Sequence, residues 1–237
     1  MSIYWEEDEK KLPYQAPEDI VDISYVLSGK TLPIDHAYAL AKAIDQALPW
    51  FMDEQDTGIH NIHVAASING WERPDDLESG VLHLSRRTRM TLRIPKERLK
   101  DAEALTGKVL DIDGSQIEVG KSIVKPLSTL PTLFSRYVFT KEGQEEPEFM
   151  DYLYNEFNKL DIKARKILCG KQSSFRTPEG LVYTRSVMVA DLEPEQSVRL
   201  QEKGIGEYRK YGCGLFLPHK GIKPVGDMSE KQHFTGN

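Results

Sequence analysis

The first half of the chain alternates between strand-like and helix-like patterns of apolar residues. Residues 21–32 alternate apolar with polar side chains, as a half-buried strand does. Residues 33–50 instead repeat apolar side chains at helical spacing, behind a proline and an aspartate that favour a helix start. The same reading predicts strands over 59–71 and 81–95, a helix over 96–107 and a hairpin over 108–120.

The second half repeats this order without repeating the sequence. It predicts a strand over 132–139, a helix over 147–162, a hairpin of 163–171 with 180–192, a helix over 193–204 and a strand over 213–221. The order β-α-β-β-α-β defines the ferredoxin-like unit. We therefore predict an α+β chain of two tandem ferredoxin-like (RRM-like) domains, each an antiparallel four-stranded sheet with two helices. Two such sheets side by side would offer a broad cleft.

Proline and serine in residues 125–131 predict the boundary between these units. The N-terminal domain is expected over residues 1–127 and the C-terminal domain over 128–237. At 237 residues, with 39% hydrophobic and 29% charged, the chain has the composition of packed rather than disordered protein.

Composition also limits the class of function. A membrane-spanning helix needs about 18 apolar residues in a row, and no apolar run in the sequence approaches that length. The amino terminus is acidic and contains no apolar signal region. We therefore expect a cytoplasmic protein without membrane contact. The net charge is −6, but basic residues gather in 85–100, 163–166 and the glycine-rich segment 204–214. Acidic surface with local basic strips is typical of a selective rather than a general binder of nucleic acid.

The predicted strand over 83–94 is the strongest of these basic strips. Alternation places one set of side chains on a single face: His83, Ser85, Arg87, Arg89 and Arg93. Arginine suits phosphate oxygens, although a solvated strand without a ligand is the alternative. Arg86 breaks the alternation and indicates a bulge or a second basic direction.

Histidines offer acid–base chemistry more readily than a metal site. His36 is expected in the first turn of the first helix, where the positive helix end disfavours a protonated ring. A neutral imidazole near pH 7 is what a general base requires, and packing on the sheet is the alternative role. His60 and His63 would point to opposite faces of a strand, and the two cysteines lie far apart, so we expect no metal.

The glycine-rich segment reads "GIGEYRKYGCG", two G-x-G pairs around Arg209 and Lys210. Glycine permits positive φ and close approach of another backbone, so this segment is expected to lie against an anion. It matches neither a Walker phosphate loop, a nucleophile elbow nor the dinucleotide fingerprint.

These residues resemble the RAMP superfamily of CRISPR-associated proteins, whose signature is a carboxyl-terminal G-h-G-x5-G-h-G with h hydrophobic. Gly204-Ile205-Gly206 and Gly212-Cys213-Gly214, five residues apart, meet it in full. The sequences "LPIDHAYALAKAIDQALPW", "SRRTRMTLRIP" and "GCGLFLPHKGI" are similar to the sixth Cas protein in the subtype named for myxobacteria. The likeness covers nearly the whole chain and implies two ferredoxin-like halves.

The resemblance implies an endoribonuclease of antiviral defence that cuts CRISPR repeat RNA without a metal or other cofactor. The ribose 2′-hydroxyl attacks the adjacent phosphate and leaves 2′,3′-cyclic phosphate and 5′-hydroxyl ends. His36 matches the family's frequent histidine near the first helix. Tyr38 and Ser85 are candidate helpers, and the stabilising cation stays open between the arginines of 86–89, such as Arg86, and Lys210.

The implied partner is a repeat hairpin, together with other Cas proteins of a type I, Cascade-like surveillance complex. Candidate RNA contacts are Arg87, Arg89, Arg93, Gly204, Gly206, Arg209, Lys210, Gly212 and Gly214, with Tyr208 or Tyr211 stacking on a base. A RAMP subunit that binds RNA without cutting is one alternative, against which His36 argues. An RRM-like regulator is the other, but the RNP aromatic motif is missing.

Overall fold

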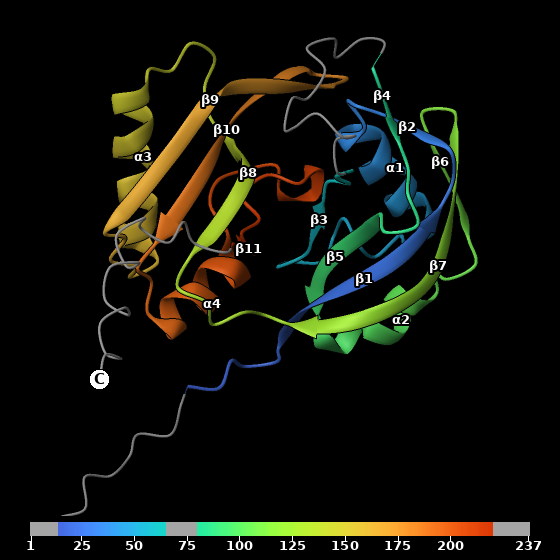
Figure 1. Cartoon of the computed structure of the whole chain (residues 1–237), viewed down its shortest axis with the longest axis horizontal. Coiled ribbons are helices and arrows are strands. Elements are labelled where there is room, and N and C mark those ends of the chain that lie inside the picture. Colours follow the sequence, from blue (N-terminus) through green and yellow to red (C-terminus); the bar gives the residue numbers. More distant parts are fainter. Residues whose placement is uncertain (1–13, 65–79, 220–237) are drawn as a thin grey trace, which may run out of the picture.

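A computed structural model describes residues 14–64 and 80–219 (Figure 1). The predicted Asn69-Gly70 turn, the end of strand 59–71 and the last residues of strand 213–221 lie outside the described residues. No helix in the described part of the chain is long and apolar enough to cross a membrane.

The first half builds an antiparallel sheet in the order β3-β5-β1-β7-β6. Its strands are β1 (Ile20–Ser28), β3 (Gly58–His60), β5 (Arg89–Pro95), β6 (Val109–Ile112) and β7 (Ser115–Pro126). The helices are α1 (Ala37–Ala47), η1 (Lys96–Arg98) and α2 (Leu99–Glu103), and a separate ribbon pairs β2 (Thr31–Pro33) with β4 (Val81–His83).

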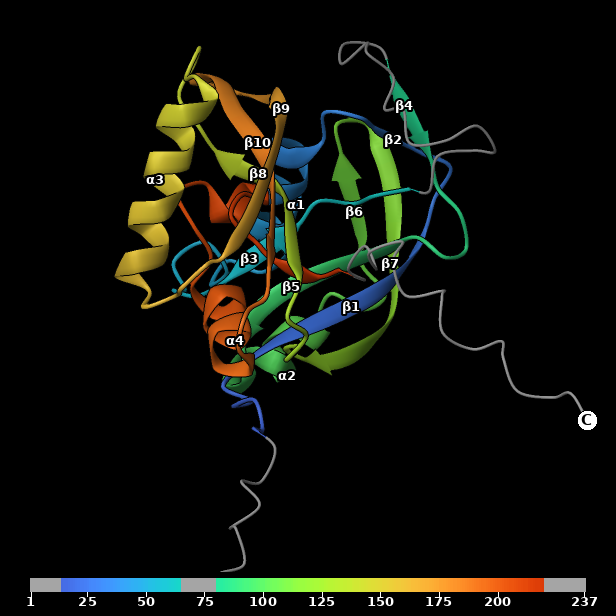
Figure 2. The same cartoon turned by 60° about the vertical axis from the view of Figure 1, so that its left-hand side comes forward.

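The second half builds a four-stranded antiparallel sheet in the order β11-β8-β10-β9. Its elements are β8 (Leu133–Phe139), α3 (Glu146–Lys159), β9 (Lys166–Thr177), β10 (Gly180–Ala190), α4 (Pro194–Lys203), η2 (Arg209–Tyr211) and β11 (Leu217–Pro218). Figure 2 shows this sheet nearly edge-on, with α3 to one side and the first sheet to the other.

The tandem ferredoxin-like fold is confirmed, with one difference in strand number. In a ferredoxin-like unit the first and third strands lie in the centre of the sheet. These are β1 and β5 in the first half, and β8 and β10 in the second half. The first sheet has five strands rather than four because the predicted hairpin 108–120 contributes both of its strands. No strand of one half pairs with the other among the described residues, and the boundary near 127 stays a prediction.

The predicted strand 81–95 divides into β4 and β5, and the expectation of one continuous arginine face is wrong. A turn interrupts it, because the Ser85 amide donates to the Thr88 hydroxyl over 3.0 Å and the Thr88 amide donates to the Ser85 carbonyl over 2.9 Å. Such local hydroxyl–backbone bonds compete with strand pairing. β4 therefore leaves the sheet and pairs with β2.

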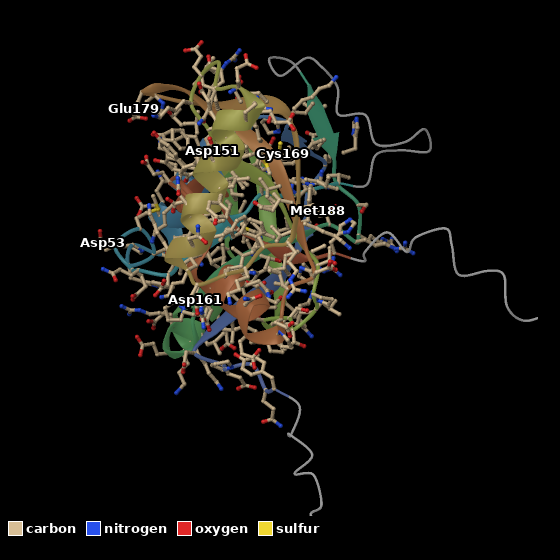
Figure 3. All side chains as sticks on the ribbon, turned by 90° about the vertical axis from the view of Figure 1, so that its left-hand side faces the viewer. Asp53, Asp151, Asp161, Cys169, Glu179 and Met188 are labelled. Atoms are coloured by element: carbon tan, nitrogen blue, oxygen red, sulfur yellow. The ribbon has the colours of Figure 1, made fainter. Side chains whose placement is uncertain are left out.

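Each sheet buries one face under its helices. In the first, alternate β1 residues such as Ile23 and Tyr25 join Leu40 of α1 in one apolar core. In the second, Val187 and Val189 pack with Phe149 of α3. Figure 3 shows Asp151 on α3 and Met188 of β10 to the side of that helix, at the right-hand edge. Met188 is paired with Phe134 of β8, so both belong to the face without helices.

Arg93 joins the two halves from the helix-free face of the first sheet. Its guanidinium is fully buried and donates to both Asp22 carboxylate oxygens over 2.8 and 2.9 Å. It also donates to the Gln201 carbonyl of α4 over 2.7 Å and to the Phe216 carbonyl over 3.1 Å. The expectation that Arg93 contacts RNA is therefore wrong, because its donors are committed to protein acceptors.

Asp22 is charged at neutral pH as a result. Burial alone would raise the pKa of its carboxyl, but the Arg93 guanidinium and the His60 ring, 3.5 Å away, together outweigh burial and hold that pKa well below its usual range. The pair is therefore a buried, doubly hydrogen-bonded ion pair whose partners depend on each other.

Arg93→Met is expected to lower the free energy of unfolding by about 3–5 kcal/mol, because it leaves the buried Asp22 carboxylate without its guanidinium partner and with only the His60 ring 3.5 Å away. Urea denaturation at pH 7 measures this. The double variant Arg93→Met/Asp22→Leu should regain a large part of the loss, since it removes the unpaired charge. A double variant as unstable as the single one would contradict this explanation.

Candidate active site

His36 stands directly before α1 as its N-terminal cap residue and is only 4% exposed. Its Nδ1 lies 2.9 Å from the Pro33 carbonyl oxygen and 3.1 Å from that of Ile34. Its Nε2 lies 3.1 Å from the Ile62 amide nitrogen. Because a carbonyl accepts and an amide donates, Nδ1 carries the proton and Nε2 accepts, so these partners select the neutral ring.

The space beside His36 is small. It is lined by His36, Asn61, Tyr137 and Phe175 among others and has a volume of about 10 Å³. That is about the room of a single water molecule. His36 is thus next to the junction of the two halves, with its Nε2 engaged by the backbone.

Tyr38 connects α1 to the glycine-rich segment. Its ring meets Tyr211 edge-on at 5.8 Å, and Tyr211 stacks on Tyr208 at 6.0 Å with 25° between the rings. Tyr208 then reaches Phe139 of β8 at 5.3 Å and is 37% exposed. An aromatic row therefore runs from the first helix across the segment to the second sheet.

Ser85 and its neighbours are not brought to His36. In the β2–β4 ribbon, Pro33 pairs with Val81 and Thr31 with His83, so His36 follows one end of the ribbon and Ser85 follows the other. The Ser85 hydroxyl accepts from the Arg87 amide over 3.3 Å within the turn described above. The expectation that Ser85 helps His36 is not supported by this arrangement.

The arginines of this turn form an exposed basic surface. Arg86, Arg87 and Arg89 are all exposed. Arg89 donates to the carbonyls of Arg86 and Thr88 over 2.8 Å each, which fixes its side chain along the turn. The predicted basic strip therefore exists on the surface without Arg93.

The glycine-rich segment folds against itself. Ile205 donates to the Gly214 carbonyl over 3.2 Å, and Gly214 donates to the Tyr137 carbonyl of β8 over 2.6 Å. Gly204 and Gly214 both have φ of +66°, and a Cβ on Gly214 would lie 2.0 Å from the Ile205 carbonyl oxygen. The two G-x-G arms thus need glycine to approach each other.

The other two glycines have different surroundings. Gly212 is buried, and a Cβ there would lie 2.6 Å from the Asn61 amide nitrogen of the first half. Gly206 is exposed and lies close to the Tyr152 hydroxyl of α3. The amides of Gly204, Gly212 and Gly214 all donate to backbone carbonyls, so they are not directed at a phosphate.

Arg209 and Lys210 turn inward, contrary to the expectation that they face RNA. Arg209 donates to the Thr57 carbonyl over 3.0 Å, and Lys210 donates to the Phe51 carbonyl over 2.7 Å and to the Glu54 carbonyl. Burial lowers the pKa of Arg209 to about 10, and burial followed by repulsion from Arg209 lowers the pKa of Lys210. Both cations anchor the segment to the loop after α1.

A larger cavity lies where the helix-free faces of the two sheets meet. It has a volume of about 200 Å³. Its lining residues include His60, Asn61, His63, Phe134, Arg136, Tyr137 and His219. It shares Asn61 and Tyr137 with the small space beside His36.

Sequence reasoning missed this cavity. His60 and His63 both line it, although strand alternation predicted opposite faces, because β3 ends at His60 and His63 lies beyond the strand. Phe134 and Arg136 do share one face of β8, a period-two signal that the sequence contains. No group of three or more metal-ligating side chains occurs within residues 14–64 and 80–219.

Comparison with known proteins agrees with the fold. The model of the family described as Cas6 Crispr matches residues 21–221. The CRISPR-associated endonuclease Cas6 of Myxococcus xanthus (strain DK1622) is 31% identical over 198 residues, which are 84% of this chain and 81% of that protein.

Solved structures share the architecture at low identity. A CRISPR-associated Cas6 protein has a TM-score of 0.57 at 13% identity, covering 85% of this chain and 100% of that one. A Cas6-related protein from Pyrococcus furiosus has a TM-score of 0.57 at 15% identity, covering 84% and 98%. Thermus thermophilus Cse3, bound to an RNA representing a pre-cleavage complex, has a TM-score of 0.50 at 11% identity, covering 84% and 98%.

The family match spans most of the chain, the M. xanthus relative is 31% identical over the aligned residues, and the solved structures repeat the two-sheet fold. The chain therefore belongs to the Cas6 family of CRISPR-associated endonucleases.

Proposed function

We propose that this protein cuts CRISPR repeat RNA by metal-independent attack of a ribose 2′-hydroxyl, leaving 2′,3′-cyclic phosphate and 5′-hydroxyl ends. The observation that carries the proposal is the neutral His36 ring, held by the Pro33 carbonyl and the Ile62 amide beside the glycine-rich segment of a Cas6 family member. A neutral imidazole exchanges protons near pH 7.

His36 acts in this proposal through Nε2, the nitrogen without a proton. Nε2 accepts from the Ile62 amide in the RNA-free chain, so RNA binding must exchange that hydrogen bond for one from the attacking 2′-hydroxyl, whose proton Nε2 takes. The leaving 5′-oxygen then receives its proton from another group or from water. Catalytic hydrogen bonds often form only in the substrate complex. Tyr38, two residues further along α1, keeps its candidate role as a helper because its ring reaches the glycine-rich segment.

The substrate proposed is a repeat hairpin. Its phosphates would meet Arg86, Arg87 and Arg89, which are exposed, while Tyr208 beside the exposed Gly206 would stack on a base. The RNA bound to Thermus thermophilus Cse3 supports RNA as the ligand class. A repeat transcript as substrate would place the activity in the cytoplasm, with other Cas proteins of a type I surveillance complex as further partners.

The reaction class is tested with repeat RNA labelled at its 5′ end. Cleavage should continue in EDTA and stop when the nucleotide at the cut carries 2′-deoxyribose, because the nucleophile is then absent. The 5′ product should carry a cyclic phosphate, detected by its resistance to phosphatase until acid opens the ring. Cutting of the deoxy substrate, or cutting only with added metal, would contradict the proposed chemistry.

His36→Gln separates chemistry from packing at His36. The Gln amide oxygen can accept from the Ile62 amide as Nε2 does, but it cannot exchange a proton. Cleavage by His36→Gln and His36→Ala should both slow by roughly 10² or more, while affinity for the deoxy repeat changes little. If His36→Gln cuts at the parental rate and only His36→Ala is slow, the histidine has a structural role alone.

Arg86→Ala/Arg87→Ala should weaken RNA binding and flatten its salt dependence. Each lost phosphate contact should reduce the slope of log affinity against log salt by about 0.7 to 0.9. Lys100→Ala on α2 is the control, because it removes an exposed cation that lies outside the proposed RNA contacts. An unchanged slope in the double variant would remove this turn from the RNA interface.

A further inference from the structure

The cavity between the two helix-free faces has the shape and lining of a site for a flat ring. At about 200 Å³ it lies below the roughly 300–1,000 Å³ of sites for drug-sized ligands. One wall comes from the segment that follows β3, and the opposite wall comes from β8 and β11. A space of this size suits one heteroaromatic base.

Aromatic rings line both sides of the cavity. His63 stacks on Tyr137 at 6.0 Å with 26° between the rings, and Phe134 meets His219 at 5.8 Å. The exposed guanidinium of Arg136 lies 5.8 Å from the Phe134 ring centre. Rings beside a cation are the arrangement by which proteins hold unpaired nucleotides, with the base on the ring and the phosphate on the cation.

Several buried polar atoms of the lining have no hydrogen-bond partner among the described residues. They are Asn61 Oδ1 and His219 Nδ1; a third lining atom, His60 Nε2, also lacks a hydrogen bond but lies 3.5 Å from the Asp22 carboxylate. Asn61 is 9% exposed, and its amide nitrogen donates to the Tyr211 carbonyl over 3.2 Å, which fixes which end of the amide is unsatisfied. Since buried polar groups are nearly always satisfied, the Asn61 oxygen points to a ligand that supplies a donor, and His219 Nδ1 offers it a second polar contact.

The charge of the lining suits an anionic ligand, as RNA is. Among its described residues the lining contains one arginine and three histidines but no carboxylate. The cavity also shares Asn61 and Tyr137 with the space beside His36, so a nucleotide held there would lie next to the proposed reacting group.

We propose that this cavity binds the base of one unpaired nucleotide of the repeat RNA, stacked against Phe134, with Arg136 on the adjoining phosphate. The inference rests on the proposed function, because it takes the RNA substrate as given. Base donors would satisfy Asn61, and the aromatic lining would exclude water from the stack.

Abasic scanning tests this directly. The probe is the CRISPR repeat RNA from the chain's own genome, made uncleavable by 2′-deoxyribose at the cut, with one unpaired nucleotide at a time made abasic. Binding is measured for the parent, for Phe134→Ala and for Lys100→Ala as the control. In the parent and the control, one position should weaken binding by about 5- to 100-fold, the usual effect of losing one stacked base.

In Phe134→Ala the same abasic position should change affinity by less than about 2-fold, because the stack is already lost. Arg136→Ala, a change at an exposed side chain, should weaken binding of the intact RNA. The proposal is overturned if the abasic effect is equal in the parent and Phe134→Ala, or if no unpaired position has an effect.

Cleavage of the all-ribose repeat separates this inference from the proposed function. If the parent cuts the repeat but the abasic substitution weakens binding equally in the parent and in Phe134→Ala, the cavity site alone is overturned. Tight binding with the expected abasic position but no cutting would overturn the proposed reaction and leave the cavity site standing.

Discussion

The buried Arg93–Asp22 pair is the interaction on which the arrangement of the two halves depends. The Arg93 side chain extends from the helix-free face of the first sheet. It donates hydrogen bonds to the backbone carbonyl of Gln201 in α4 and to that of Phe216, directly before β11. Removing a partner leaves a buried charge, so the pair tolerates few alternative positions of the second half. Leu215 and Leu217, on either side of Phe216, line the cavity, so the Arg93 bond to the Phe216 carbonyl ties one wall of the cavity to the first sheet.

The glycine-rich segment is the second region that holds the two halves together. Its glycines bring its two arms together and against Tyr137, while Arg209 and Lys210 anchor it to the loop after α1. The segment that the sequence predicted to lie against an anion therefore serves mainly for close backbone packing. Its contribution to the site is indirect: it holds Tyr208 and Tyr211 in line with Tyr38 and places the N-terminal end of α1 beside the second sheet.

Periodicity in the sequence predicted most of the fold, because each sheet buries one face and each helix one stripe. The strand over 132–139 and the helix over 193–204 differ from β8 and α4 by a residue or so. Prediction failed where a local bond or a distant partner decided the outcome. The Ser85–Thr88 turn ended a strand that apolar alternation would have continued, and Arg93 was buried by groups about 70 to 120 residues away in sequence. The direction of Arg209 and Lys210 likewise depends on carbonyls of the loop after α1, which no local pattern reveals.

The position of His36 follows from two opposing requirements. Proton transfer needs a neutral ring, and the Pro33 carbonyl and Ile62 amide supply partners that only this form can satisfy. The Ile62 amide occupies Nε2, the nitrogen that acts in the proposed mechanism, so in the RNA-free chain the ring is oriented but engaged. The Ile62 amide lies one residue from both Asn61 and His63 of the larger cavity. A base bound in that cavity, as proposed above, would contact the same segment that supplies the Ile62 amide to Nε2.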